Sequence, residues 1–234
     1  MVFKILFIDM DSKFTKWVKY YFKNVPGIEC KTCKVQDYKP ADNERVAYVS
    51  PLNNSGAMDT GIDQDYNIFM FRNIRFTVRK KIMDLSTYLK KSGVKLPPEM
   101  QFRLPYLPVG SSIILPIEGT VHCLIGAPTL SYCSVYNDTP KNAYYAFKAI
   151  LKAVFNYVSF FGDNKIDTVV IPALCCGSSQ VDPKESAHQI FNAYFECLMG
   201  EDTDLPLYNK ALCYIYQSPE YLTYNKLVSI NQEI

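Results

Sequence analysis

Long apolar runs are missing from this chain of 234 residues. No apolar stretch reaches the roughly 18 residues that a membrane-spanning helix needs. The short apolar segment at residues 2–8 is followed at once by Asp9 and Asp11, unlike a secretory leader. We therefore expect neither a membrane anchor nor a signal peptide. The eight cysteines are then expected to stay reduced, in the cytoplasm or the nucleus.

Net charge is also small. The formal value is +2, and charged residues make up 21% of the chain, whereas general nucleic-acid binding needs a concentrated basic surface. The densest basic stretch contains Arg72, Arg75, Arg79, Lys80 and Lys81. On a helix these positions mostly share one side, and we interpret them as a solvated helix face. We expect no general nucleic-acid binding and no membrane partner.

Histidine is rare, with two residues in the chain, which limits metal sites and acid–base catalysis. Cys30 and Cys33 have the spacing of half a zinc site, but no second pair completes four ligands. We therefore predict no metal. Cys175 and Cys176 with His188 as base would suggest a nucleophilic site. Small loop residues and a surface histidine are the simpler interpretation, so acyl-transfer catalysis is not expected.

Short apolar strands alternate with amphipathic helices along the chain. This alternation predicts an α/β fold, a three-layer α/β/α sandwich with a mixed, mostly parallel central sheet. No repeat or low-complexity linker divides residues 1–234, so we expect a single domain, with a surface insertion at 84–105. The predicted strands are 2–8, 28–35, 45–50, 111–117, 121–127, 166–171 and 211–216. The predicted helices follow Asp11 or Ser12, span 65–83, begin at Thr139-Pro140 and begin after Asp182.

Two loops rich in small residues each follow a predicted strand. The first covers 50–63 and the second 174–179. In open α/β sheets, ligands collect at the carboxyl ends of strands, where loops and helix starts offer unpaired N–H groups to anions. We expect Gly177 to adopt a positive φ so that the backbone can approach a phosphate. Either loop alone is a weak indication, because such loops are common.

The order of several motifs along the chain is more specific. The chain resembles macro domains, α/β modules that bind ADP-ribose, from residue 2 to about residue 221. The likeness is greatest to a branch whose first loop reads Met-Asp-Gly-Gly-Ile-Asp. The motifs are Gln36-Asp37-Tyr38, Val46-Ala-Tyr-Val-Ser leading into Met58-Asp-Thr-Gly-Ile-Asp, Leu107-Pro-Val-Gly-Ser-Ser, Ile125-Gly-Ala-Pro-Thr-Leu, Thr139-Pro-Lys-Asn-Ala-Tyr and Ile171-Pro-Ala-Leu-Cys-Cys-Gly.

This resemblance implies that the chain binds ADP-ribose or a related NAD-derived nucleotide, free or attached to protein, without a further cofactor. Asp37 would accept a hydrogen bond from the adenine amine, with Tyr38 next to it. Asn53 would contact the distal ribose. Tyr216 is the candidate for an aromatic side chain beside the adenine.

The resemblance also implies how the two loops bind the rest of the ligand. The end of the first loop would lie along the ribose and phosphates through Gly61, Ile62 and Asp63. The second loop would hold the diphosphate through its backbone amides. Its residues are Leu174, Cys175, Cys176, Gly177, Ser178 and Ser179.

The chain departs from the hydrolase branch of the family at two places. The unbroken glycine run of that branch corresponds here to residues 58–61, and its histidine corresponds to Asn67, which cannot take a proton near neutral pH. Catalysis is therefore the first alternative: hydrolysis of an ADP-ribosyl ester or of ADP-ribose 1″-phosphate, with water positioned by Asp63 and with Asn53 nearby. A scaffold that has lost the ligand is the second.

Overall fold

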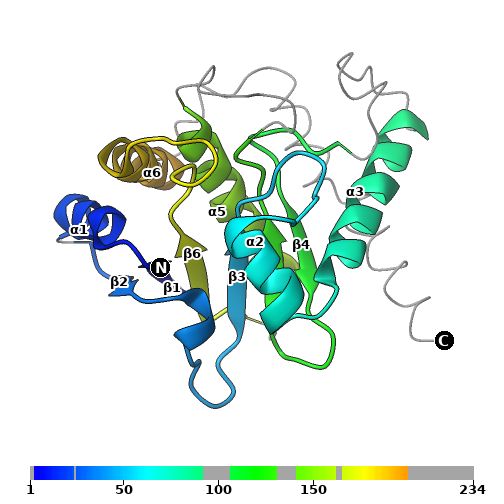
Figure 1. Cartoon of the computed structure of the whole chain (residues 1–234), viewed down its shortest axis with the longest axis horizontal. Coiled ribbons are helices and arrows are strands. Elements are labelled where there is room, and N and C mark those ends of the chain that lie inside the picture. The colour runs from blue at the N-terminus through cyan, green and yellow to red at the C-terminus, as the bar shows by residue number, and fades with distance from the viewer. Residues whose placement is uncertain (1–2, 24, 92–105, 131–140, 162–164, 200–234) are drawn as a thin grey trace.

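The computed structural model describes residues 3–23, 25–91, 106–130, 141–161 and 165–199. Within them, one sheet has the strand order β2-β1-β6-β3-β5-β4 (Figure 1). All neighbours are parallel except β4, which pairs antiparallel with β5 at one edge. The strands are β1 (Lys4–Asp9), β2 (Ile28–Thr32), β3 (Val46–Ser50), β4 (Ile113–Pro116), β5 (Cys123–Gly126) and β6 (Thr168–Pro172). The predicted mixed, mostly parallel sheet is confirmed.

Helices cover both faces of this sheet (Figure 1). On one face lie α1 (Ser12–Tyr21), α5 (Asn142–Phe161) and α6 (Pro183–Met199). On the other lie α2 (Gly61–Asp65), a π-helical turn (Tyr66–Met70) and α3 (Ile74–Lys91). The three layers confirm the α/β/α sandwich. No helix in the described ranges combines the length and the apolar character that crossing a membrane requires.

The strands supply both cores because successive side chains point to opposite faces. In β1, Ile5 and Phe7 belong to the core under α1, α5 and α6, while Leu6 and Ile8 belong to the core under α3. The Phe7 ring lies 5.7–6.1 Å from the rings of Phe14, Phe22 and Phe147. Burial of these apolar faces is the main stabilising contribution to the fold.

Two helix starts occur where the sequence predicts them. Asp11 caps α1, with its Oδ1 accepting from the Lys13 N–H at 2.9 Å. Asp182 caps α6 in the same way, with Lys184 N–H at 2.9 Å. Each carboxylate satisfies an N–H group that has no partner inside the helix. The predicted start of α5 at 139–140 lies outside the described residues, as does the predicted strand 211–216.

The single helix predicted over 65–83 is wrong. The chain forms a π-helical turn, in which the Phe71 N–H donates to the Tyr66 carbonyl at 2.8 Å, and a new helix follows. Asn67 Oδ1 accepts from the Arg75 N–H at 3.1 Å and so caps the first turn of α3. The interruption lets the Phe71 ring stack on the buried Tyr66 ring at 5.6 Å. Tertiary packing therefore overrides the helical periodicity at this point.

Two further predicted boundaries also differ from the structure. The strand predicted at 28–35 ends at Thr32, because β1, its strand partner within the described residues, ends opposite it at Asp9. A 3₁₀ turn (Val35–Asp37) follows. The first part of the surface insertion predicted at 84–105 is wrong, since residues 84–91 belong to α3 and Leu85 and Ser86 are buried. Residues 92–105 lie outside the described residues.

Candidate functional site

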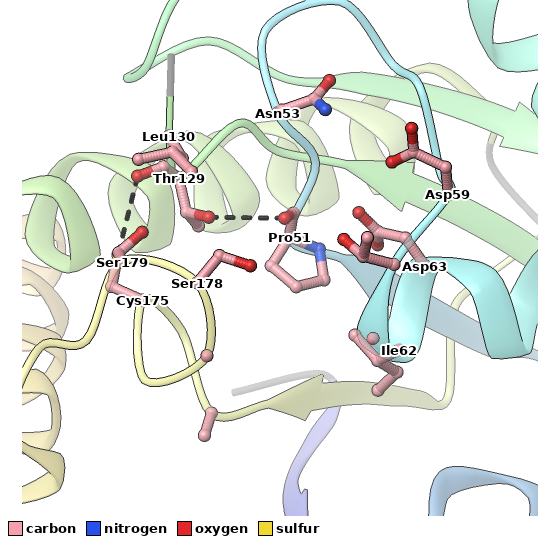
Figure 2. A pocket seen from close by; sticks show the side chains of 14 residues that line it. Pro51, Asn53, Asp59, Ile62, Asp63, Thr129, Leu130, Cys175, Ser178 and Ser179 are labelled. Carbon is pink, nitrogen blue, oxygen red and sulfur yellow. Dashed lines mark hydrogen bonds between the residues drawn. The ribbon is translucent and has the colours of Figure 1, made fainter. Parts of the chain in front are cut away.

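A cavity of about 150 Å³ lies at the carboxyl ends of β3, β5 and β6 (Figure 2). We call it the strand-end cavity. The first loop and α2 contribute Pro51, Asn53, Asp59, Thr60, Gly61, Ile62 and Asp63. The segment after β5 contributes Thr129 and Leu130, and the loop after β6 contributes Ala173, Cys175, Gly177, Ser178 and Ser179. These three strands are parallel neighbours, so the segments that follow them meet at one edge of the sheet.

The first loop is organised by the side chain of Asn53. Its Oδ1 accepts from the Ser55 N–H at 3.1 Å, the Ser55 hydroxyl at 2.9 Å and the Ala57 N–H at 3.1 Å. Asparagine suits such a position because its short amide can bond to nearby backbone. The oxygen of Asn53 therefore shapes the loop, while the residue also lines the cavity.

Backbone pairing between β3 and β5 continues past the strand ends into the cavity wall. The Thr129 N–H donates to the Leu52 carbonyl at 2.8 Å, and the Asn54 N–H donates to the Leu130 carbonyl at 3.0 Å. The Thr129 hydroxyl also donates to the Pro51 carbonyl at 3.3 Å (Figure 2). These bonds fix the base of the first loop against the segment that follows β5.

The second loop turns sharply at Cys175. This residue has a φ of +63° and is buried, with its Sγ donating to the Thr129 carbonyl at 3.9 Å. The positive φ expected at Gly177 is wrong, since Gly177 is not among the residues with positive φ. Gly177 is exposed instead, and a Cβ built on it would meet nothing within 4 Å. The strained residue thus anchors the loop, and the glycine keeps the outer surface open.

Asp63 is a buried acidic residue in the cavity wall, with 8% of its surface exposed. The Ser50 hydroxyl donates to its Oδ1 at 2.5 Å. Burial raises the pKa of Asp63 to about 7, the Ser50 hydrogen bond opposes this rise, and the nearby charge of Asp59 adds to it. Asp63 therefore exchanges its proton close to neutral pH.

The two loop cysteines do not have the properties of a nucleophile. Burial raises the pKa of Cys176 to about 11 and that of Cys175 further, whereas a reactive cysteine needs a lowered pKa. His188 stacks on Tyr21 at 5.3 Å and does not line the cavity. In the described part of the chain, no three His, Cys, Asp or Glu side chains are grouped so that they could hold a metal ion.

The structure brings together most of the residues predicted for the two loops. Asn53, Gly61, Ile62, Asp63, Cys175, Gly177, Ser178 and Ser179 all line the strand-end cavity. Leu174 is fully buried beneath the second loop, where its carbonyl accepts from the Ser186 hydroxyl at 2.7 Å. The Cys176 Sγ points back to the same carbonyl at 3.5 Å. Neither of these two side chains lines the cavity.

The residues predicted for adenine are not grouped with the loops. The Tyr38 hydroxyl donates to Glu44 Oε1 at 3.0 Å, and Glu44 also accepts from Thr168, the first residue of β6. Tyr38 thus reaches toward the amino ends of the strands, at the edge opposite the cavity. Asp37 is exposed on the 3₁₀ turn and does not line the cavity. Tyr216 lies outside the described residues.

Sequence reasoning missed part of the cavity wall. The missed residues are Pro51, Asp59, Thr60, Thr129, Leu130 and Ala173. Asp59 and Thr60 sit inside the first loop, so a position between strand and helix was the available signal. Thr129 and Leu130 are recognisable only once β5 is known to lie beside β3. Asn67 does not line the cavity, because its side chain caps α3.

No protein-family model matches the chain, and no curated protein matches it. The resemblance to macro domains therefore stays a prediction that rests on the motifs and their order.

Proposed function

We propose that the chain binds ADP-ribose or a related NAD-derived nucleotide, free or attached to protein, in the strand-end cavity. One observation carries the proposal. The two loops with macro-domain resemblance, far apart in sequence, line the same cavity at the carboxyl ends of parallel strands. This is the location at which open α/β sheets bind their ligands. Backbone groups from both loops can then act on one ligand.

The second loop has the donors that an anion needs. Among the described residues, the backbone N–H groups of Gly177, Ser178 and Ser179 donate to no other protein group. Backbone N–H groups gathered in a turn form a favourable site for phosphate oxygens. This arrangement supports binding of the diphosphate by the second loop.

The size of the cavity limits how much of the ligand it encloses. About 150 Å³ is less than the roughly 300–1,000 Å³ of typical small-molecule pockets. A ribose with its neighbouring phosphate is a suitable occupant, and the rest of the nucleotide would lie along the surface.

Hydrolysis of an ADP-ribosyl bond is the second candidate function, and the state of Asp63 favours it. A general base works best when its pKa lies near the working pH, and the pKa of Asp63 is raised to about 7. Asn67 offers no such group, and its oxygen already accepts from the Arg75 N–H. Asp63 is therefore the candidate general base among the residues that line the cavity.

We further propose a cytoplasmic or nuclear location. The six cysteines in the described part of the chain are free thiols, which fits a reducing compartment.

Calorimetric titration with ADP-ribose tests the proposed binding. We expect saturable binding with a Kd in the micromolar range, roughly −8 kcal/mol. No binding at millimolar ligand would overturn the proposal and favour a scaffold without ligand. Incubation with mono-ADP-ribosylated protein then separates the two functions. Release of ADP-ribose that is lost in Asp63→Asn, with binding retained, would favour a hydrolase, and no release by the unmodified protein would favour a reader.

A further inference from the structure

The strand-end cavity has an uneven distribution of charge. Asp59 and Asp63 line it from the side of the first loop and α2. Figure 2 shows Cys175, Ser178 and Ser179 on the opposite side, where the side chains are neutral. No lysine, arginine or histidine is among the described residues that line the cavity. One wall is therefore acidic, with no cation on the lining to balance it.

The two acids differ in their surroundings. Asp63 is buried and held by the Ser50 hydroxyl, whereas Asp59 is exposed to solvent at the cavity mouth. The charge of Asp59 contributes to the raised pKa of Asp63, so the two carboxyl groups interact through space. A negatively charged ligand group between these two carboxyl groups would be repelled by Asp59, and also by Asp63 whenever Asp63 is ionised.

The acidic wall favours a ligand end that carries sugar hydroxyl groups over one that carries a phosphate. A carboxylate is a hydrogen-bond acceptor, so it matches the hydroxyl groups of a sugar, which can donate. A phosphate monoester carries about two negative charges near neutral pH. Its oxygens are hydrogen-bond acceptors, and they would face carboxylate oxygens that are also acceptors. The phosphates of the ligand are better placed on the neutral wall, beside the N–H groups of Gly177 and Ser178.

We propose that Asp59 is a specificity-determining residue, which makes the strand-end cavity accept a ribose end bearing free hydroxyl groups and reject a ligand that carries a phosphate there. This inference rests on the proposed binding of an ADP-ribose-like nucleotide in the direction that the resemblance implies, and it adds a discrimination between two kinds of ligand end. The diphosphate faces the second loop and the distal ribose faces Asp59. It also narrows the possible hydrolase activity, because ADP-ribose 1″-phosphate becomes the disfavoured substrate and an ADP-ribosyl ester the favoured one.

Calorimetry at pH 8, where Asp63 is largely ionised, tests the proposal with two probes, ADP-ribose and ADP-ribose 1″-phosphate. For the unmodified protein we expect binding of ADP-ribose to be stronger by about tenfold or more, equivalent to about 1.4 kcal/mol. Asp59→Asn keeps the shape of the side chain and removes its charge. In this variant we expect the phosphorylated probe to gain affinity, so that the ratio falls below about threefold, equivalent to about 0.7 kcal/mol.

Asp65→Asn is the matched control, because Asp65 is a carboxylate of the same segment that does not line the cavity. We expect this variant to keep the ratio of the unmodified protein. Raising the salt concentration to 1 M should narrow the ratio in the unmodified protein and leave Asp59→Asn nearly unchanged, because salt screens the repulsion. A merely structural effect of the substitution would not show this dependence on salt.

The outcomes separate this inference from the function on which it rests. Equal affinity of the unmodified protein for both probes, or an unchanged ratio in Asp59→Asn, would overturn the role of Asp59 and leave nucleotide binding standing. Failure of both probes to bind would overturn the proposed function and the inference with it. Thermal melting of each variant shows whether the fold is intact, and we expect Asp59→Asn to be folded because Asp59 is exposed.

Discussion

The hydroxyl of Ser50 donates a hydrogen bond of 2.5 Å to the buried carboxyl group of Asp63. Ser50 is the last residue of β3 and Asp63 lies in α2, so this bond joins the two ends of the first loop. It places a titratable group at the cavity wall, where burial acts strongly on its pKa. A buried hydrogen bond thus holds together the two ends of the loop that would contact the ligand.

Asp63 should make the stability of the fold decrease as the pH rises from about 4 to 7. Its pKa is raised from 3.8 to about 7 in the folded state. Below pH 3.8 the carboxyl group is protonated in both the folded and the unfolded state. Between pH 3.8 and about 7 it stays protonated only in the folded state, so the free energy of unfolding falls as the pH rises through this range. Above pH 7 the resulting loss in the free energy of unfolding is on the order of 4 kcal/mol at most.

Urea unfolding at pH 5 and pH 8 measures this effect. We expect Asp63→Asn to be more stable than the unmodified protein at pH 8, because its neutral amide can still accept from the Ser50 hydroxyl. The advantage should shrink at pH 5. An advantage of equal size at both pH values would contradict the raised pKa.

Gly56 and Gly61 should respond differently to alanine, although both have a positive φ, of +64° and +57°. A Cβ on Gly56 would lie 2.8 Å from Ile82 Cδ1 and 3.0 Å from Val78 Cγ1, in the core under α3, whereas a Cβ on Gly61 would meet nothing within 4 Å. We expect Gly61→Ala to cost about 1 kcal/mol from backbone strain and Gly56→Ala about 2–4 kcal/mol from strain and crowding. Chemical denaturation measures both, and equal losses would argue against close packing of the first loop on α3.

Asn67→Ala should reduce stability without reducing ligand binding. The substitution removes the oxygen that accepts from the Arg75 N–H, and loss of a helix cap typically costs about 1 kcal/mol. Asn67 does not line the strand-end cavity, so the Kd for ADP-ribose should stay within about twofold, equivalent to about 0.4 kcal/mol. Unfolding and calorimetry on the same variant are the measurements. A large loss of affinity in a folded variant would show that Asn67 acts at the cavity after all.

Gly177 tests the placement of the phosphate without disturbing the fold. A Cβ at this position meets open space, so Gly177→Ala and Gly177→Val should both melt near the temperature of the unmodified protein. We expect ADP-ribose affinity to fall in the order glycine, alanine, valine, with valine losing about tenfold or more, since the larger side chain crowds the ligand. Calorimetry across the three proteins gives the series, and unchanged affinity in Gly177→Val would refute the role of the second loop.

The sequence by itself determines the layered α/β fold, because the features that predict it involve residues close together in the chain. Alternation within β1 sends Ile5 and Phe7 to one core and Leu6 and Ile8 to the other, and Asp11 and Asp182 satisfy the first N–H groups of their helices. These features depend on neighbours in the chain, so pattern and capping rules find them. The motif order likewise predicts which two loops form the cavity.

Only the tertiary structure decides the composition and charge of the cavity. Thr129 and Leu130 become part of its wall because β5 lies next to β3 in the sheet, a relation that no local pattern encodes. Asn67 caps α3, which begins only after the π-helical turn that lets Phe71 stack on Tyr66. The pKa of Asp63 follows from its burial and from the approach of Ser50 and Asp59. These distances are set when the elements pack, and they turn an acid of the first loop into a group that titrates near neutral pH.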